Sequence, residues 1–204
     1  MASSFKVIVA YFIIYYLVFM SRNYKFHNKS GVYSVSFATV YWLDIFTRQL
    51  YYNILVDSVN YCRKEKGMEL FGYCFMPSHV HLIFRSCNED SSGLLRDFKK
   101  YTSKRLVKAI EENPQESRKE WLLWMMERAG SKKNNVDKRQ FWQHHNKPIE
   151  LWSTHVIKQK LDYTHFNPVE SGFVTNPEDW KYSSTRNVQD DHTVMKIDTI
   201  GFLS

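Results

Sequence analysis

The sequence of 204 residues is poor in cysteine, glycine and proline, with three, seven and five residues of each type. The three cysteines form no CxxC pair, so neither a disulfide framework nor a cysteine-ligated metal site is expected. A reduced, cytoplasmic protein is the matching expectation. With 44% hydrophobic residues and no internal repeat, the chain is neither collagen-like nor intrinsically disordered. Its length suits one domain with a buried core.

The longest apolar run is short and lies at the N-terminus, over residues 7–20. A membrane span needs about 20 apolar residues, and no small-residue cleavage site of a signal peptide follows the run. Three interpretations stay open: translation starting at Met20, a membrane anchor, and a buried helix. We expect residues 1–19 to be an apolar extension, residues 20–186 to form the functional domain, and residues 187–204 to be a tail.

Positive charge exceeds negative charge, with 28 Lys and Arg against 21 Asp and Glu, a net charge of +7 and an isoelectric point near 9.2. Lys6 is the only charged residue before Met20, so the basic character belongs to the rest of the chain. Such an excess indicates a polyanionic partner, although proteins without one share it.

Hydrophobic periodicity predicts alternating strands and helices. The expected strands are 31–40, 69–76 and 79–85, with a further extended segment at 141–152. The expected helices are 46–66, 92–112, 117–129 and 155–167, the last stopped by Pro168. The order matches the ferredoxin-like split βαβ arrangement, an α+β fold whose antiparallel sheet carries helices on one face and here a helical insertion before the last strand. The other face would be open to a ligand.

A histidine pair lies on the third predicted strand. His79 and His81 are two residues apart, so both imidazoles project from one face of the strand, while Val80, Leu82 and Phe84 project from the other. Two neutral imidazoles side by side can bind a divalent metal ion. The alternative is that both rings lie on a solvated face without a function.

The last predicted helix carries Tyr163 and Asn167, four residues apart and therefore on one helical face. The pKa of a phenol is about 10, and a nearby cation would favour its nucleophilic phenolate form. A tyrosine beside a metal site suits attack on a phosphodiester. The alternatives are that Tyr163 anchors the helix in the core and that Asn167 only ends the helix before Pro168.

These two motifs together resemble those of the single-tyrosine HUH transposases, within the IS200-like group and in particular its REP-associated tyrosine transposases. The resemblance extends from about Tyr24 to Ser184, most of the expected domain, and leaves out residues 1–19. Its segments are GYCFMPSHVHLIF, then FWQ, then DYTHFNPVESGFV and PEDWKYSS. Their combination is more specific than any one of them.

The resemblance implies a ferredoxin-like fold, a divalent ion (Mg²⁺ or Mn²⁺) and cleavage of single-stranded DNA. It implies that His79 and His81 bind the ion and that Tyr163 forms a 5′-phosphotyrosine intermediate. Asn167 stands where a third metal ligand is expected; many IS200-like enzymes carry glutamine there, and asparagine has a shorter reach. The implied partner is single-stranded or hairpin DNA, with neither a small-molecule substrate nor a membrane. Some relatives are dimers that exchange the tyrosine helix, and the REP-associated branch favours a monomer.

Cations near aromatic rings are expected to hold the DNA, because cations bind phosphates and rings stack on bases. The candidates are Lys99, Lys100, Lys104, Arg105, Lys108, Lys132, Lys133, Lys138, Arg139 and Trp142. The alternative is a solvated helix face and a surface loop. A rival nucleophile is Tyr101, although Arg105, four residues on, is not a metal-binding type. Weaker candidates for the metal are His144, His145 and His165.

The sequence therefore predicts a metal-dependent transposase that cleaves and rejoins single-stranded DNA through a 5′-phosphotyrosine, at hairpin-bearing ends of a mobile element. The alternative is a nucleic-acid-binding protein of the same fold without catalysis, in which the histidines are incidental. The presence of His79, His81 and Tyr163 in one chain favours the enzyme.

Overall fold

The computed structural model describes residues 25–131, 138–189 and 194–200. The predictions for residues 1–19 and Met20, including the apolar run, lie outside the described residues, as do Lys132 and Lys133. Within the described ranges, every helix is too short or too polar to cross a membrane.

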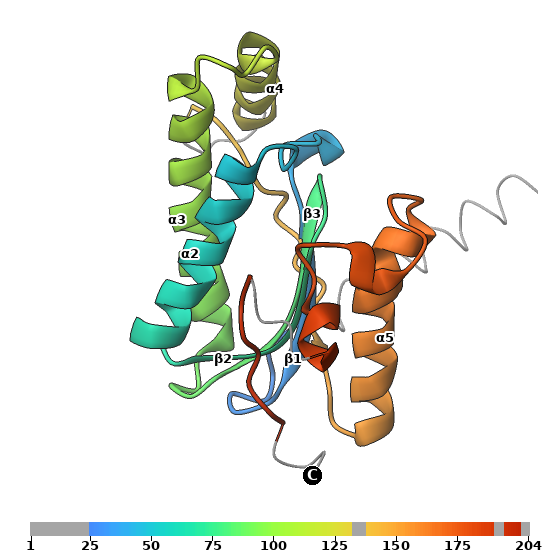
Figure 1. Ribbon diagram of the computed structural model, residues 1–204. Coiled ribbons are helices and arrows are strands. Elements are labelled where there is room, and N and C mark those ends of the chain that lie inside the picture. The colour runs from blue at the N-terminus through green and yellow to red at the C-terminus, as the bar shows by residue number, and fades with distance from the viewer. Residues whose placement is uncertain (1–24, 132–137, 190–193, 201–204) are drawn as a thin grey trace, which may run out of the picture.

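Four antiparallel strands form one sheet in the order β2-β3-β1-β4 (Figure 1). Their bounds are β1 (Tyr33–Ala38), β2 (Met68–Phe75), β3 (His79–Ser86) and β4 (Ile149–Glu150). Met76, Pro77 and Ser78 join β2 to β3, a short connection as expected for a hairpin. This strand order and the α+β composition confirm the ferredoxin-like prediction.

The last strand is shorter than the predicted extended segment 141–152. Within this segment, Ile149 and Glu150 form the ladder with β1, and Trp142 makes an isolated bridge to Thr39. The left-handed φ of Lys147, 41°, and the missing N–H of Pro148 explain the difference, because both interrupt a continuous ladder.

Two helices cover one face of the sheet, α2 (Gln49–Glu65) and α3 (Ser91–Glu112), and they pack against each other (Figure 1). Leu95 and Phe98 of α3 join the main core, where they meet the buried side chains of β3 that alternate with its histidines. Asp90 caps α3 by accepting a hydrogen bond from the backbone N–H of Gly93, at 2.7 Å. The amphipathic patterns therefore place the core as expected.

The helix α5 (Thr154–Glu170) lies on the opposite face of the sheet (Figure 1). The prediction that all helices share one face and leave the other open is wrong in this respect. A second apolar cluster explains the position, because Ile157 of α5 packs there with Phe71 of β2 and Ile83 of β3. Both faces of the sheet thus carry apolar side chains that need cover.

A glycine lets α5 approach the sheet closely. Gly72 lies at an irregularity in the β2–β3 register, and a Cβ atom there would meet Leu161 Cδ2 of α5 at 2.8 Å. A residue with a side chain would displace the helix or the leucine.

The same helix continues beyond Pro168, where it was expected to stop. Proline removes only one intrahelical N–H, and in the last turn few bonds remain to be lost. The helix ends two residues later, where the N–H of Ser171 donates to the carbonyl of Asn167 at 3.0 Å and Gly172 adopts a left-handed φ of 74°.

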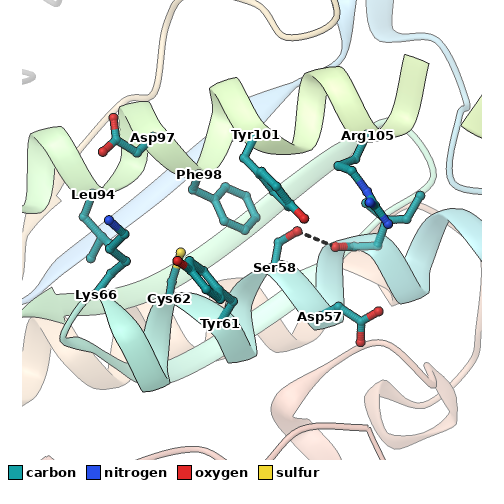
Figure 2. Close-up of a pocket in the computed structure, with 11 residues that line it drawn as sticks. Asp57, Ser58, Tyr61, Cys62, Lys66, Leu94, Asp97, Phe98, Tyr101 and Arg105 are labelled. Carbon is teal, nitrogen blue, oxygen red and sulfur yellow. Dashed lines mark hydrogen bonds between the residues drawn. The ribbon is translucent and has the colours of Figure 1, made fainter. Parts of the chain in front are cut away.

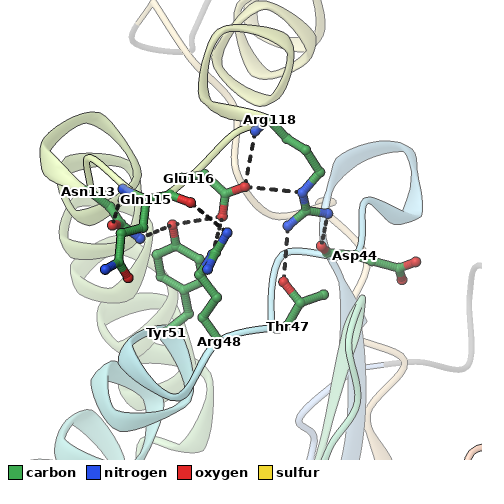
Figure 3. A network of polar contacts seen from close by, with 8 residues as sticks. All are labelled: Asp44, Thr47, Arg48, Tyr51, Asn113, Gln115, Glu116 and Arg118. Carbon is green, nitrogen blue, oxygen red and sulfur yellow. Dashed lines mark hydrogen bonds and ion pairs between the residues drawn. The ribbon is translucent and has the colours of Figure 1, made fainter.

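The predicted insertion is helical, as α4 (Lys119–Gly130), and a polar network anchors it (Figure 3). Glu116 is 3% exposed and accepts hydrogen bonds from Arg48, Tyr51 and Arg118, each at 3.1 Å. Arg118 also donates to the backbone carbonyl of Asp44. The carboxylate therefore joins the start of α2, the link from α3 to α4, and the segment after β1.

Short helical turns and an extended tail complete the chain. The turns are η1 (Val40–Trp42), η2 (Pro177–Asp179) and η3 (Ser184–Gln189). In the tail, Met195 is buried in the main core, and the backbone N–H of Asp198 donates to the carbonyl of Leu70 at 2.7 Å. The described part of the tail therefore covers the outer edge of β2, which would otherwise present unpaired backbone groups.

Candidate active site

The two histidines of β3 project together from the face that α5 covers. Their ring centroids are 4.9 Å apart, with the planes at 82°. His81 is 2% exposed, whereas His79 is half-buried at the end of the strand. Strand alternation alone gives this shared face, so the predicted pairing of the two imidazoles is confirmed.

The helix α5 brings Tyr163 and Asn167 to the same place. The ring centroid of Tyr163 lies 5.5 Å from that of His81, and Asn167 Oδ1 lies 3.1 Å from His79 Nε2. Ser78 Oγ approaches the other nitrogen of His79, Nδ1, at 3.3 Å and so helps to orient the ring. The four predicted site residues therefore converge, within a single chain.

Both imidazoles are neutral at physiological pH. Burial, together with the neighbouring His79, lowers the pKa of His81 to about 3. Burial also lowers the pKa of His79, although the hydrogen bond to Asn167 opposes the change. Neutral imidazoles with a free lone pair are the form that binds a metal ion.

The residues present fit a divalent ion. His81 Nε2 is buried and has no hydrogen-bond partner in the described protein, which is unusual for a buried polar atom. In the described ranges, no three His, Cys, Asp or Glu residues form a cluster, so the protein would offer two imidazoles and the amide oxygen of Asn167. Such an incomplete set leaves coordination positions for phosphate oxygens.

Tyr163 is 46% exposed, so its phenol is accessible from solvent beside the buried imidazoles. Lys160, one turn earlier in α5, places its Nζ atom 5.5 Å from the centre of the tyrosine ring. The alternative that Tyr163 is a core anchor is therefore wrong, because an anchoring ring would be buried.

The comparison with protein families matches residues 29–127 to the IS200-like transposases. Over these residues, which are just under half of the chain, the protein is similar to the IS200-like transposases. The matched residues run from before β1 into α4, and so include both histidines; Tyr163 and Asn167 follow them in the chain.

A curated relative is similar over more of the chain. A protein of Haemophilus influenzae, named as a REP-associated tyrosine transposase, is 25% identical over 167 residues, which are 81% of this chain and 85% of that protein. The fold also matches a solved structure of a REP-associated tyrosine transposase bound to a REP hairpin, with a TM-score of 0.57 and 17% identity. That match covers 86% of this chain and 88% of the solved one.

The predicted DNA-binding cations of α3 belong to a helix on the other side of the sheet from α5, which covers the histidines (Figure 1). Lys100, Lys104 and Arg105 are exposed there, and Arg105 lines a pocket between α2 and α3 together with Tyr101 (Figure 2). Lys108 pairs with Glu112 at 3.6 Å. Tyr101 is thus separated from the imidazoles by the sheet and is no rival nucleophile.

Lys99 differs from its neighbours because its ammonium group is bound within the protein. It donates to the carbonyl of Gln143 at 2.8 Å and to Asn146 Oδ1, and it lies 5.1 Å from the centre of the Phe37 ring. Burial lowers the pKa of this lysine to about 8. Its contacts fix the segment after α4 to α3, which differs from the expected role of a phosphate-binding cation.

The remaining predicted DNA contacts are also mostly structural. Trp142 is 5% exposed, and its indole N–H donates to Thr102 Oγ1 at 3.0 Å, so the prediction that it stacks on a base is wrong. Arg139 pairs with Glu111 of α3 and Glu127 of α4. Lys138 is exposed. The pattern of basic and aromatic residues around 138–142 reflects packing of the insertion.

One rival metal ligand of the sequence analysis is engaged elsewhere. His165 Nε2 lies 2.8 Å from Ser184 Oγ, and that hydroxyl in turn contacts the backbone of Tyr73. This contact ties α5 to η3 and β2.

Sequence reasoning missed Trp42. Its ring centroid lies 5.3 Å from that of His79, in an edge-on arrangement, and the indole is 56% exposed. The residue lies in η1, between the first predicted strand and helix, where periodicity gives no signal.

Proposed function

We propose that this protein is a single-tyrosine transposase that cleaves and rejoins single-stranded DNA. The observation that carries the proposal is the convergence of Tyr163 on the buried pair His79 and His81, with Asn167 completing the group. The similarity of residues 29–127 to the IS200-like transposases supports DNA as the substrate.

In the proposed reaction, Tyr163 Oη attacks the scissile phosphorus and forms a new P–O bond while the bond to the 3′ oxygen breaks. The phenol loses its proton, and the departing 3′ oxygen takes one up, so the products are a 5′-phosphotyrosine and a free 3′ hydroxyl. The number of phosphodiester bonds is unchanged, and the reverse attack by a 3′ hydroxyl can rejoin DNA without ATP.

His79, His81 and Asn167 would hold a Mg²⁺ or Mn²⁺ ion. When bound, such an ion would polarise the phosphate and neutralise part of its charge. The protein's own contribution is positional: Ser78 orients His79, and α5 fixes the phenol beside the imidazoles. Lys160 adds a positive charge next to the tyrosine ring.

The proposed partner is a DNA hairpin with an unpaired flank. The solved relative of the same fold is bound to a REP hairpin, and a flexible unpaired strand can bring its phosphate in line with the tyrosine. We also propose that the protein acts as a monomer, because α5 and β3 of one chain complete the site without a helix from a second copy.

The test is formation of a covalent adduct. The full chain is incubated with Mn²⁺ and labelled hairpins whose loops and unpaired tails are randomised, and adducts are separated under denaturing conditions. We expect an adduct with the wild-type protein, its loss in Tyr163→Phe, and a fall of at least about 100-fold in His81→Ala. Tyr101→Phe is the matched control and should react like the wild type.

Binding of hairpins without an adduct, in Mg²⁺ and in Mn²⁺, would contradict the proposal and favour the non-catalytic DNA-binding alternative. An adduct that persists in Tyr163→Phe would show that another residue is the nucleophile.

A further inference from the structure

We propose that Trp42 is a base-stacking residue that positions an unpaired nucleotide of the DNA strand beside the candidate site. This inference rests on the proposed function and adds to it the chemistry by which the strand is held. The ligand is an unpaired nucleobase, and the contact is with the exposed part of the indole.

The backbone at this place is strained. Tyr41 has a φ of 53° and Trp42 a φ of 56°, the left-handed region that side-chain-bearing residues disfavour, and two such residues follow each other. Non-glycine residues keep this conformation only where the surroundings impose it, and such residues cluster at ligand sites.

The surroundings here do impose it. Thr39 Oγ1 donates to the carbonyl of Leu43, at 2.8 Å, across the turn, and the backbone N–H of Thr39 donates to the carbonyl of Ser78, at 2.9 Å. After the turn, the N–H of Phe46 donates to the carbonyl of Pro77, at 2.9 Å. The turn is therefore fixed to the β2–β3 connection, next to the strand position that carries His79.

The indole is held beside the site but is not packed into the core. The rings of Trp42, His79, His81 and Tyr163 form three successive contacts, with centroid distances of 5.3, 4.9 and 5.5 Å. Trp42 is nevertheless 56% exposed, so part of its surface remains available to a ligand.

A purely structural tryptophan in this protein has different surroundings. Trp142 is buried among Phe37, Phe46 and Phe141, and its N–H has a hydrogen-bond acceptor. Trp42 combines a strained backbone with an exposed ring, an arrangement that packing alone does not require. Stacking on an unpaired base would give that exposed ring a partner, and every base offers a suitable face.

The experiment measures DNA binding and base dependence together. A hairpin that forms an adduct is taken from the randomised pool, and abasic sites are placed one at a time along its unpaired tail. Affinities are measured by fluorescence anisotropy in the Tyr163→Phe background, which cannot cleave. We expect one tail position at which loss of the base weakens binding of the protein with Trp42 by roughly 5- to 150-fold.

At that position, Trp42→Ala should already bind the intact DNA just as weakly, and the abasic site should cause no further loss. Trp42→Phe should keep most of the affinity. Tyr61→Ala is the matched control, because Tyr61 is equally exposed, at 56%, but lies on α2 on the other side of the sheet. It should bind like the wild type.

A second variant separates stacking from folding. Trp42→Gly relieves the left-handed strain, so its melting temperature should not fall below that of the wild type, whereas its DNA affinity should fall as in Trp42→Ala. The inference is overturned if Trp42→Ala binds DNA as tightly as the protein that keeps Trp42. It is also overturned if the losses of affinity from Trp42→Ala and from the abasic site multiply at every tail position. Either result leaves the adduct of Tyr163, and hence the proposed function, standing on its own test.

Discussion

His81 is a buried imidazole whose Nε2 atom has no partner in the described protein. A group kept neutral by burial binds a proton more weakly in the folded than in the unfolded chain, where the pKa of histidine is about 6.5. Its contribution to stability is therefore fully present above pH 6.5 and is lost as the pH falls towards the folded pKa of about 3.

We therefore expect the stability of the protein to depend on pH, and we expect a substitution of His81 to weaken that dependence. In buffer with EDTA, the free energy of unfolding should fall with decreasing pH between 6.5 and 4, and His81→Phe should make that slope shallower by about 1 kcal/mol per pH unit. A residual slope is expected, because the pKa values of His79 and His165 are also lowered by burial. Urea unfolding at several pH values gives both slopes; equal slopes would mean that His81 is not buried as a neutral ring.

At the scale of the element, α5 decides whether a site exists. It carries Tyr163 and Asn167, and it reaches the histidines only because it lies on their face of the sheet. Ser153 begins the helix by accepting a hydrogen bond from the N–H of Val156, at 3.3 Å. The close approach to β2 depends on Gly72.

Gly72→Ala should therefore disturb α5 more than a small substitution in an ordinary strand. The new methyl group would meet Leu161 Cδ2, and we expect a loss of about 1–3 kcal/mol in the free energy of unfolding together with less adduct formation. Leu161→Ala removes the opposing atom, so the double variant should be more stable than the sum of the two single effects by at least about 0.5 kcal/mol. Strict additivity in denaturant unfolding would contradict the proposed contact.

At the scale of the whole molecule, the buried carboxylate of Glu116 connects α2 to the link between α3 and α4. Burial alone would raise the pKa of Glu116, but hydrogen bonds from Arg118 and Arg48 outweigh it and lower the pKa. The segment after β1, which carries Trp42, reaches this network through the carbonyl of Asp44 (Figure 3).

Glu116→Ala should destabilise the whole protein, because it leaves two arginines and the Tyr51 hydroxyl without their shared acceptor. The side chains of Arg48 and Arg118 are about one third exposed, so solvent can partly replace the lost contacts. We therefore expect the free energy of unfolding to fall by about 1–3 kcal/mol, less than for a fully buried ion pair. Thermal and urea unfolding measure it, with exposed Glu112→Ala as the control. A variant as stable as the wild type would show that the network is dispensable.

The sequence of β2 contains information that the prediction of one open face did not use. The strand β2 is buried at almost every position, and its near-continuous apolar run is typical of a strand covered on both faces. Half-exposed strands alternate instead. The presence of a helix on each side could therefore have been inferred from residues 68–75, although not which helix.

Local periodicity by itself determined the elements and the pairs of side chains that share a face of one element. It placed His79 with His81 and Tyr163 with Asn167, because such pairs depend only on the repeat of a strand or a helix. The segments 91–112 and 119–130 are helical within a few residues of the prediction for the same reason.

Only the tertiary structure decided how these faces meet. The position of α5 against the histidines, the burial of Trp142, the internal contacts of Lys99 and the exposed turn at Trp42 all depend on residues far apart in the chain. The sequence neighbours of a charged or aromatic residue do not show on which side of the sheet that residue lies. That choice follows from which apolar surfaces of the folded chain remain to be covered.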